Sequence, residues 1–240
     1  MAIEVKQINE DIYTIEDGIV RAFVINGENK TALIDAGITG GKEFKDAVLS
    51  ISKNPVVTLI THADFDHIAG VPEFGVPYIH PSEMAHYGME IAKVDNKNFP
   101  IEVNSMWDGE FVDIGGYKLE SVLLPGHTPG SVGFIDREHK IMFIGDTVSM
   151  SIVFMNGFQR NYFALEATLK KLQKMAEAGK FNILYSAHGE AAVKISQIGV
   201  ELEGIEKLIK GELKEQPIPP YLQMKNGKLY TYKTAMFLTE

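Results

Sequence analysis

Short runs of apolar and β-branched residues, separated by turn residues, open the chain. Three such runs cover Ile12 to Ile15, Arg21 to Ile25 and Thr31 to Ile34, and glycine-containing pairs such as Asp17-Gly18 and Asn26-Gly27 interrupt them. Alternation of this kind is typical of strands joined by tight turns. The first forty residues therefore predict a meander of antiparallel strands.

After this meander, helical and strand-like patterns alternate. A helical pattern over about Gly41 to Ser52 leads into the continuous apolar run Val56 to Ile60, which predicts a buried strand. Helices are also expected at about Pro81 to Tyr87, Ala164 to Ala178 and Ser196 to Lys214. Strands are also expected at Val76 to Ile79, Glu110 to Val112, Lys118 to Leu124, Gly133 to Asp136, Lys140 to Ile144 and Asn182 to Tyr185.

This order of elements predicts a mixed α/β (α+β) fold, and the length suits a single domain over residues 1–240. At the C-terminus the prolines Pro217, Pro219 and Pro220 predict an extended strap laid over the body of the domain.

Composition narrows the classes of partner. The formal charge of −9 opposes binding to phosphate backbones, so no nucleic-acid partner is expected. No window approaches the ~18 apolar residues of a membrane span, and the N-terminus lacks a basic region followed by an apolar stretch. We therefore expect no membrane partner and a cytoplasmic location.

The densest chemical signal lies directly after the run Val56 to Ile60. Four potential metal ligands, His62, Asp64, Asp66 and His67, occupy six consecutive residues there. Two imidazoles and two carboxylates this close cost desolvation when they are buried without a partner, and a cation is their natural partner. The chain has no cysteine, so nitrogen and oxygen must hold any metal. This segment predicts half of a metal site.

Three more potential ligands follow predicted strands in the same way. They are His127, Asp146 and His188, and each has a glycine beside it. Ligand sites of open α/β sheets form at the carboxyl ends of the strands, so four strands of similar sense would bring all these residues to one edge. The glycines would let the backbone approach closely.

With these residues in this order, the sequence resembles the metallo-β-lactamase-fold superfamily, whose signature is His-x-His-x-Asp-His followed by a later His, an Asp and a final His. The resemblance implies a four-layer αββα sandwich that holds two divalent metal ions at one edge of its central sheets. It also implies the ligands: His62, Asp64 and His127 for the first metal, Asp66, His67 and His188 for the second, and Asp146 as the bridge.

Other acidic and histidine residues receive lesser roles. Asp35, in the segment Leu33 to Gly37, is expected to orient a ligand or a loop from outside the ligand set. His80, His86 and His139 fit no ligand position, so we expect ordinary surface or capping roles for them.

Asp64 departs from the signature, which has a histidine at that position. Its carboxylate adds a negative charge to the first metal site, which should weaken the Lewis acidity of the cation and raise the pKa of bound water. Zinc is the first expectation, and the added oxygen ligand makes iron or manganese suitable too. The flavodiiron branch of the superfamily has Glu there, which opens a second hypothesis: a non-heme di-iron oxygen-binding or redox protein that uses a separate redox partner.

The leading hypothesis is a metal-dependent hydrolase. A hydroxide bound between two metals would attack a small-molecule ester, thioester or lactone, and Asp66 would orient the hydroxide or accept its proton. A third hypothesis is a metal-binding sensor domain without catalysis. We expect the chain to act as a monomer or a homodimer.

Substrate contacts are expected from the apolar run Met150 to Phe163. Its candidate residues are Phe154, Met155, Phe158 and Tyr162. Methionine and phenylalanine bury apolar groups without requiring polar partners, so this run suits an acyl or aromatic group. Core packing and a dimer contact are the alternatives.

Overall fold

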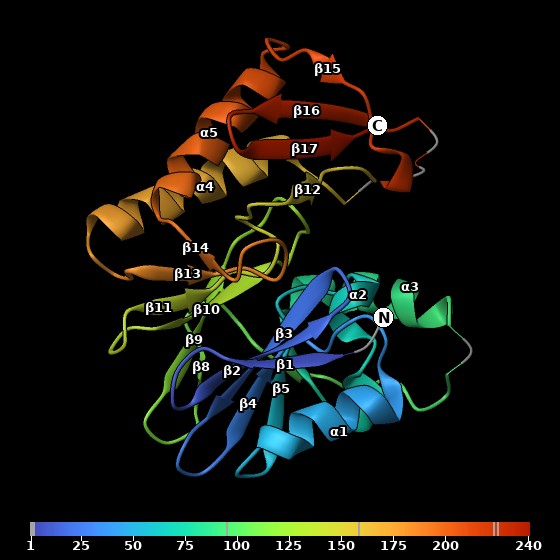
Figure 1. The fold of residues 1–240 in the computed structure, drawn as a ribbon, viewed down its shortest axis with the longest axis vertical. Coiled ribbons are helices and arrows are strands. Elements are labelled where there is room, and N and C mark those ends of the chain that lie inside the picture. Colours follow the sequence, from blue (N-terminus) through green and yellow to red (C-terminus); the bar gives the residue numbers. More distant parts are fainter. Residues whose placement is uncertain (1–2, 95, 158, 223, 225) are drawn as a thin grey trace.

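The computed structural model describes residues 3–240 except residues 95, 158, 223 and 225, and its centre is a pair of large sheets (Figure 1). The first sheet has seven strands in chain order: β1 (Glu4–Gln7), β2 (Ile12–Asp17), β3 (Val20–Asn26), β4 (Thr31–Ile34), β5 (Val56–Leu59), β6 (Tyr78–Ile79) and β7 (Asn104–Ser105). β1 to β4 pair antiparallel, which confirms the predicted meander, and β4 to β7 pair parallel.

The second sheet has six strands in the order β14 (Ala192–Val193), β13 (Ile183–Tyr185), β11 (Ile141–Phe143), β10 (Val132–Asp136), β9 (Lys118–Leu123) and β8 (Phe111–Asp113). β10 is antiparallel to both β9 and β11, and β11 is parallel to β13. The strands β9, β11 and β13 therefore run in the same sense, so their carboxyl ends share one edge of the sheet.

Helices cover the outer faces of both sheets. On the first sheet lie α1 (Gly41–Ile51), α2 (Phe65–Ile68) and α3 (Met84–Ala92), with the short 3₁₀ turns η1 (Val71–Glu73) and η2 (Pro81–Glu83). On the second lie α4 (Tyr162–Glu177) and α5 (Ser196–Ile209). The layers follow the order helix, sheet, sheet, helix, which confirms the expected αββα sandwich.

Apolar side chains fill each of the three interlayer spaces. Phe23 and Phe143 pack between the two sheets, with ring centroids 5.0 Å apart. Phe44 of α1 is buried against the first sheet, and Leu169 of α4 is buried against the second. Burial of this apolar area is the main force that holds the layers together.

A third, four-stranded sheet corrects the expected C-terminal strap. It consists of β12 (Ile152–Phe154), β17 (Ala235–Thr239), β16 (Lys228–Tyr232) and β15 (Glu215–Gln216), and it packs against α5. The three prolines lie between β15 and the 3₁₀ turn η3 (Pro220–Leu222) or at the start of that turn. Beyond the prolines, β16 and β17 form an antiparallel hairpin that is rich in aromatic and apolar residues. Phe237 of β17 is fully buried against the helices and so holds this hairpin on the domain.

Other boundaries differ from the expected ones by a few residues. α5 ends at Ile209 instead of Lys214, because Gly211 takes a positive φ of 69° that stops the helix. α4 ends near Gly179, as predicted. Among the helices that the structure describes, we find none with the length and apolar character needed to cross a membrane.

Candidate metal centre

The predicted ligand residues meet where strands from the two sheets end. His62 follows β5 of the first sheet, and Asp66 and His67 lie on the short helix α2 that comes next. In the second sheet, three strands run in the same direction: β9, β11 and β13. They are followed by His127, Asp146 and His188, respectively. All seven predicted ligands thus lie close together, although they span 127 positions of the chain from 62 to 188.

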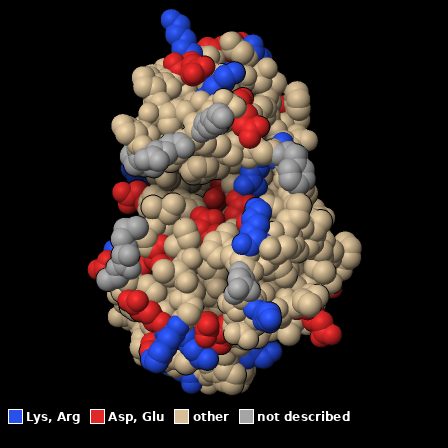
Figure 2. Space-filling view, turned by 90° about the vertical axis from the view of Figure 1, so that its right-hand side faces the viewer, with Lys and Arg blue, Asp and Glu red and all other residues tan. Residues whose placement is uncertain are grey.

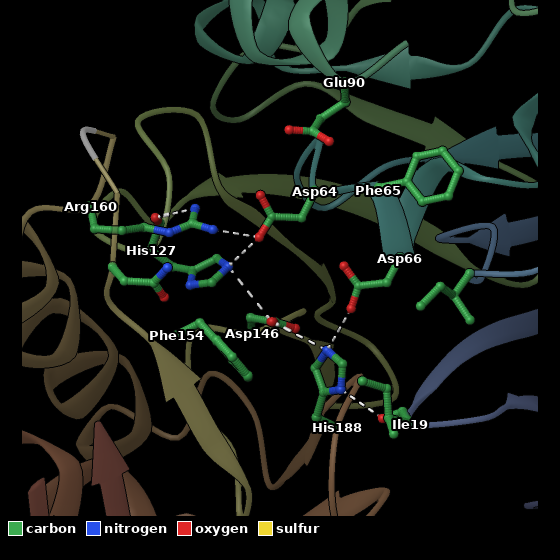
Figure 3. Close-up of a pocket in the computed structure, with 12 residues that line it drawn as sticks. Ile19, Asp64, Phe65, Asp66, Glu90, His127, Asp146, Phe154, Arg160 and His188 are labelled. Atoms are coloured by element: carbon green, nitrogen blue, oxygen red, sulfur yellow. Dashed lines mark hydrogen bonds and ion pairs between the residues drawn. The ribbon is translucent and has the colours of Figure 1, made fainter. Parts of the chain in front are cut away.

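One group of ligand atoms surrounds Asp146 and the end of α2. Nε2 of His188 lies 3.3 Å from Oδ2 of Asp66 and 3.3 Å from Oδ2 of Asp146 (Figure 3). Nε2 of His67 lies 3.3 Å from Oδ1 of Asp146 and 3.6 Å from Oδ2 of Asp66. We call Asp66, His67 and His188 the second group, following the predicted order of the two metals, and Asp146 lies directly beside this group.

The first group lies directly beside it and comprises His62, Asp64 and His127, with Asp146 as the neighbour of both groups. Nε2 of His127 lies 3.2 Å from Nε2 of His62 and 3.1 Å from Oδ2 of Asp64. Oδ2 of Asp146 lies 3.6 Å from Nε2 of His127 and 4.0 Å from Nε2 of His62. Among the carboxylates that the structure describes, Asp146 is therefore the one that contacts histidines of both groups.

These spacings fit a metal ion. Four ligand atoms placed about 2.0–2.1 Å from one ion in a tetrahedron lie roughly 3.3–3.4 Å from one another. Nε2 of His67 and Oδ1 of Asp146 are buried and have no hydrogen-bond partner in the described part of the chain. Buried polar atoms without partners are costly, and a cation at this position would satisfy both of them. With no thiolate available, the donor set of imidazole and carboxylate suits zinc, iron or manganese.

The electrostatics of the second group favour a positive charge. Burial lowers the pKa of His188, but Asp146 and Asp66 outweigh burial and raise this pKa to about 10. Burial raises the pKa of Asp146, but His188 and His67 hold it well below its usual range. Protons supply the positive charge in the absence of a metal, and a metal ion would displace them.

Backbone and side-chain partners fix the histidine rings. Nδ1 of His67 lies 2.9 Å from Oδ2 of Asp35, and Nδ1 of His188 donates to the carbonyl of Ile19 at 2.7 Å. Both contacts turn Nε2 towards the cluster. Asp35 also accepts from the backbone N–H of Thr61 at 2.8 Å, so it holds the segment before His62 as well. These contacts are those that the orienting role expected for Asp35 requires.

Buried side chains that the sequence analysis did not identify hold the ligand loops. Glu83 accepts from the backbone N–H of Ala63 at 2.9 Å and of Gly130 at 2.7 Å, which ties the loop of His62 to the loop of His127. Arg21 donates to the carbonyls of Ser186 and Gly189 on either side of His188. Contacts between such distant segments leave no local pattern in the sequence.

Two glycines allow the close approach of the loops, as expected. A Cβ atom on Gly126 would lie 2.5 Å from the backbone N of Leu165 in α4, and Gly126 has a φ of 143°. A Cβ atom on Gly145 would lie 2.6 Å from Oγ1 of Thr61. Larger residues would push the loops of His127 and Asp146 away from their neighbours.

Asp64 has two partners that were not predicted. Its Oδ1 lies 2.6 Å from Nε2 of His86. Its Oδ2 accepts from Nη2 of Arg160 at 2.6 Å (Figure 3). The expected surface or capping role is therefore wrong for His86, because this side chain is buried against Asp64. His80 does cap η2, where it accepts from the N–H of Ser82, and His139 lies in an exposed turn.

A cavity of about 340 Å³ opens above the cluster. Its floor includes Asp64, Asp66, Asp146 and the adjoining histidines, and four apolar residues line its rim: Ile19, Ile38, Phe65 and Phe154. Figure 2 shows a hollow at mid-height of the visible face, with acidic residues at its floor and basic residues beside it.

Of the candidate substrate residues, one lines this cavity and two pack in the core. Phe154 lines the cavity. Met155 is only 2% exposed and packs in the core between α4 and the third sheet, so its position does not support a substrate contact. Tyr162 starts α4 and packs against the same core. Phe158 lies outside the described residues.

Comparison with known proteins supports this architecture. The family model described as the metallo-beta-lactamase superfamily matches residues 15–188. A metallo-beta-lactamase from Pontibacter korlensis has a similar structure, with a TM-score of 0.66, 20% sequence identity, and coverage of 85% of this chain and 99% of the other. The chain belongs to the metallo-beta-lactamase superfamily.

Curated proteins that resemble this chain include two with the names of hydrolases. Hydroxyacylglutathione hydrolase GloC from Haemophilus influenzae is 27% identical over 59% of this chain and 70% of the relative. Acyl-coenzyme A thioesterase MBLAC2 from Gallus gallus is 25% identical over 52% of this chain and 56% of the relative. Family membership and these matches identify the chain as a metal-binding hydrolase of the metallo-β-lactamase fold.

Proposed function

We propose that this protein hydrolyses thioesters of small-molecule acids with two divalent metal ions, zinc first among them. The observation that supports this best is Asp146, whose two carboxylate oxygens contact histidines of two adjacent ligand groups. The first metal would be held by His62, Asp64 and His127, the second by Asp66, His67 and His188, with Asp146 shared between them.

Bound divalent metals supply a Lewis acid for the carbonyl and bring the pKa of water at the site towards neutrality. The chain itself contributes position and proton transfer. Asp66 lies on the cavity floor with Oδ2 3.3 Å from His188, where it can orient a water molecule or accept its proton. Thr61, Asp35 and Ile19 hold the imidazole rings of His62, His67 and His188, respectively, during the reaction.

The cavity suggests the shape of the acyl group. Ile19, which is 65% exposed, and Phe154 place apolar surface at the rim, next to a strongly polar floor. A substrate with a reactive carbonyl and a modest apolar chain matches both surfaces. The names of the two relatives, a hydroxyacylglutathione hydrolase and an acyl-coenzyme A thioesterase, both describe thioester cleavage. We therefore place thioesters before oxygen esters and lactones.

Thiol release measures this activity directly. Protein loaded separately with zinc, manganese and iron is supplied with acyl thioesters of increasing chain length, with the matching oxygen esters and lactones in parallel. We expect thiol release that is lost on chelation and restored by metal. The proposal fails if none of the loaded forms releases thiol above the rate of an Asp66→Asn variant.

Metal analysis separates the hydrolase from the di-iron hypothesis. Protein purified without oxygen should contain two metal ions per chain and show no visible charge-transfer bands if zinc is the native metal. Iron with bands that change on exposure to oxygen would instead favour the redox protein. Metal without any turnover on the substrate panel would favour the sensor domain.

A further inference from the structure

We propose that Arg160 is a specificity-determining residue for the metal centre: it neutralises Asp64, so that the pair stands in for the histidine of the usual signature. This inference rests on the proposed function, because it concerns the cation of the first group. The first group would then present a metal with the same net charge as three neutral imidazoles. From Asp64 alone we predicted a more negative site and a weaker Lewis acid. The positive charge of Arg160 would cancel that added negative charge.

The guanidinium of Arg160 is largely buried and donates two hydrogen bonds beside the first group. The residue lies just before α4, 96 positions after Asp64 in the sequence. Its Nη2 donates to Oδ2 of Asp64 at 2.6 Å, and its Nη1 donates to the backbone carbonyl of His127 at 2.6 Å. Both members of the ion pair are largely buried, with side chains 11% and 19% exposed. A charge-assisted contact with this degree of burial is stronger than a surface pair.

The contact falls on the oxygen that faces the other ligands. Oδ2 of Asp64 lies 3.1 Å from Nε2 of His127, whereas Oδ1 of Asp64 is turned towards His86 at 2.6 Å. The guanidinium and a metal ion would therefore share Oδ2. Sharing reduces the negative charge that Asp64 offers to the metal.

Glu90 adds no unpaired negative charge beside Asp64 and Arg160. Glu90 of α3 lines the same cavity but pairs with Lys93. Two unit charges about 5 Å apart at an effective dielectric constant near 20 change an equilibrium roughly 100-fold, so the sign of Arg160 matters to any cation there.

A cycle of variants tests the pairing through metal binding alone. The variants are Asp64→His, Arg160→Gln and the double variant Asp64→His with Arg160→Gln. Zinc content after dialysis and zinc affinity by chelator competition are measured for each. Asp64→His restores the usual ligand but leaves Arg160 unopposed, so we expect the first zinc to bind roughly 100-fold more weakly. The double variant restores the charge balance and should recover affinity to within about 10-fold of the wild type.

Two controls make the result specific. Arg160→Lys keeps the positive charge and should keep both metals, even though it loses the two-pronged contact. Arg137→Gln breaks an exposed pair with Glu120 on the second sheet and should leave both affinities unchanged. Retention of the second metal in each variant reports that the fold is intact.

The possible outcomes distinguish the two proposals. A double variant that binds the first zinc no better than Asp64→His overturns the charge pairing. A manganese-to-zinc affinity ratio that does not rise in Arg160→Gln also overturns it, since the uncompensated carboxylate should favour the cation with the stronger preference for oxygen. Wild-type protein that binds only one metal, in the second group, overturns the two-metal function itself.

Discussion

Oδ2 of Asp35 lies 2.9 Å from Nδ1 of His67, and both side chains are buried. The contact leaves Nε2 of His67 pointing at Asp146 and Asp66. Asp35 adopts a φ of 61°, a conformation that aspartate tolerates better than most residues, and its carboxylate also accepts two contacts from Thr61. The carboxylate therefore aligns ligands on two consecutive segments.

Asp35→Asn should lower the affinity of the second group for its metal by roughly 10- to 100-fold, because the neutral amide no longer holds the imidazole ring of His67 or increases its basicity. Chelator competition with zinc measures the change. The matched control is Asp136→Asn, which alters a pair between a buried aspartate and an exposed histidine away from the ligand cluster, where Oδ1 of Asp136 lies 2.9 Å from Nδ1 of His139. If both variants weaken metal binding equally, the role assigned to Asp35 is wrong.

Asp146→Ala should lower the metal content from two ions per chain towards one. Both carboxylate oxygens face histidines, so removing them deletes a ligand from each group. Elemental analysis after dialysis gives the stoichiometry. Unchanged content of two metals would remove Asp146 from its shared position.

Glu83→Gln should destabilise the protein even without metal. Glu83 uses both oxygens to accept backbone N–H groups, and an amide can replace only one of them. The other buried N–H would face an NH₂ group, at a cost of about 1–3 kcal/mol. Denaturant unfolding in the presence of a chelator measures this loss. Glu73→Gln, in a partly exposed pair with Lys45, should cost less than about 0.5 kcal/mol.

Phe154→Ala should raise KM for thioesters with apolar acyl chains and leave the metal content unchanged. The ring lines the cavity but contributes no ligand atom. Loss of the apolar contact should weaken substrate binding by about 1–3 kcal/mol, and the loss should shrink as the acyl chain is shortened. Phe163→Ala, an exposed phenylalanine on α4, is the control. Equal effects of both variants on KM would exclude Phe154 from the substrate site.

That the seven candidate ligands come together could be predicted from the sequence, because each of them follows a strand or lies on the short helix after one. His127, Asp146 and His188 carry a local signature, an apolar run followed by a ligand beside glycine, and strand direction then brings them together. Arg160 and His86 carry no such signature. Their contacts with Asp64 span 96 and 22 positions, and only the packing of α3 and the segment before α4 creates them.

The third sheet escaped prediction for a related reason. Its strands are short, and β12 pairs with β17 across more than eighty positions, so no hairpin signal links them. The prolines near residue 217 favoured the prediction of an extended strap over that of strands. The burial of Phe237 against the helices became apparent only with the tertiary structure.

Glu201 of α5 is buried behind the loop that follows Asp146. Its Oε1 accepts from the backbone N–H of Ser149 at 2.8 Å, and its Oε2 has no partner among the described residues. Burial raises the pKa of this carboxyl to about 8, because a charged carboxylate is poorly solvated there. The folded protein therefore holds the proton over a range in which the unfolded chain releases it.

Glu201 should make the protein less stable as the pH rises. Between about pH 4.5, the usual pKa of the group, and about pH 8, the folded state binds more protons than the unfolded state, so the free energy of unfolding falls with pH. The contribution of Glu201 to stability is fully present below pH 4.5 and is lost as the pH rises to 8.

Glu201→Gln keeps an acceptor for Ser149 and cannot ionise, so the variant should gain stability over the wild type as the pH rises from 5 to 8. Each pKa unit of difference corresponds to about 1.4 kcal/mol, which gives a gain of several kcal/mol at pH 8. Denaturant unfolding of both proteins with a chelator present measures the difference across this range, and parallel pH profiles would show that Glu201 does not titrate in the folded state.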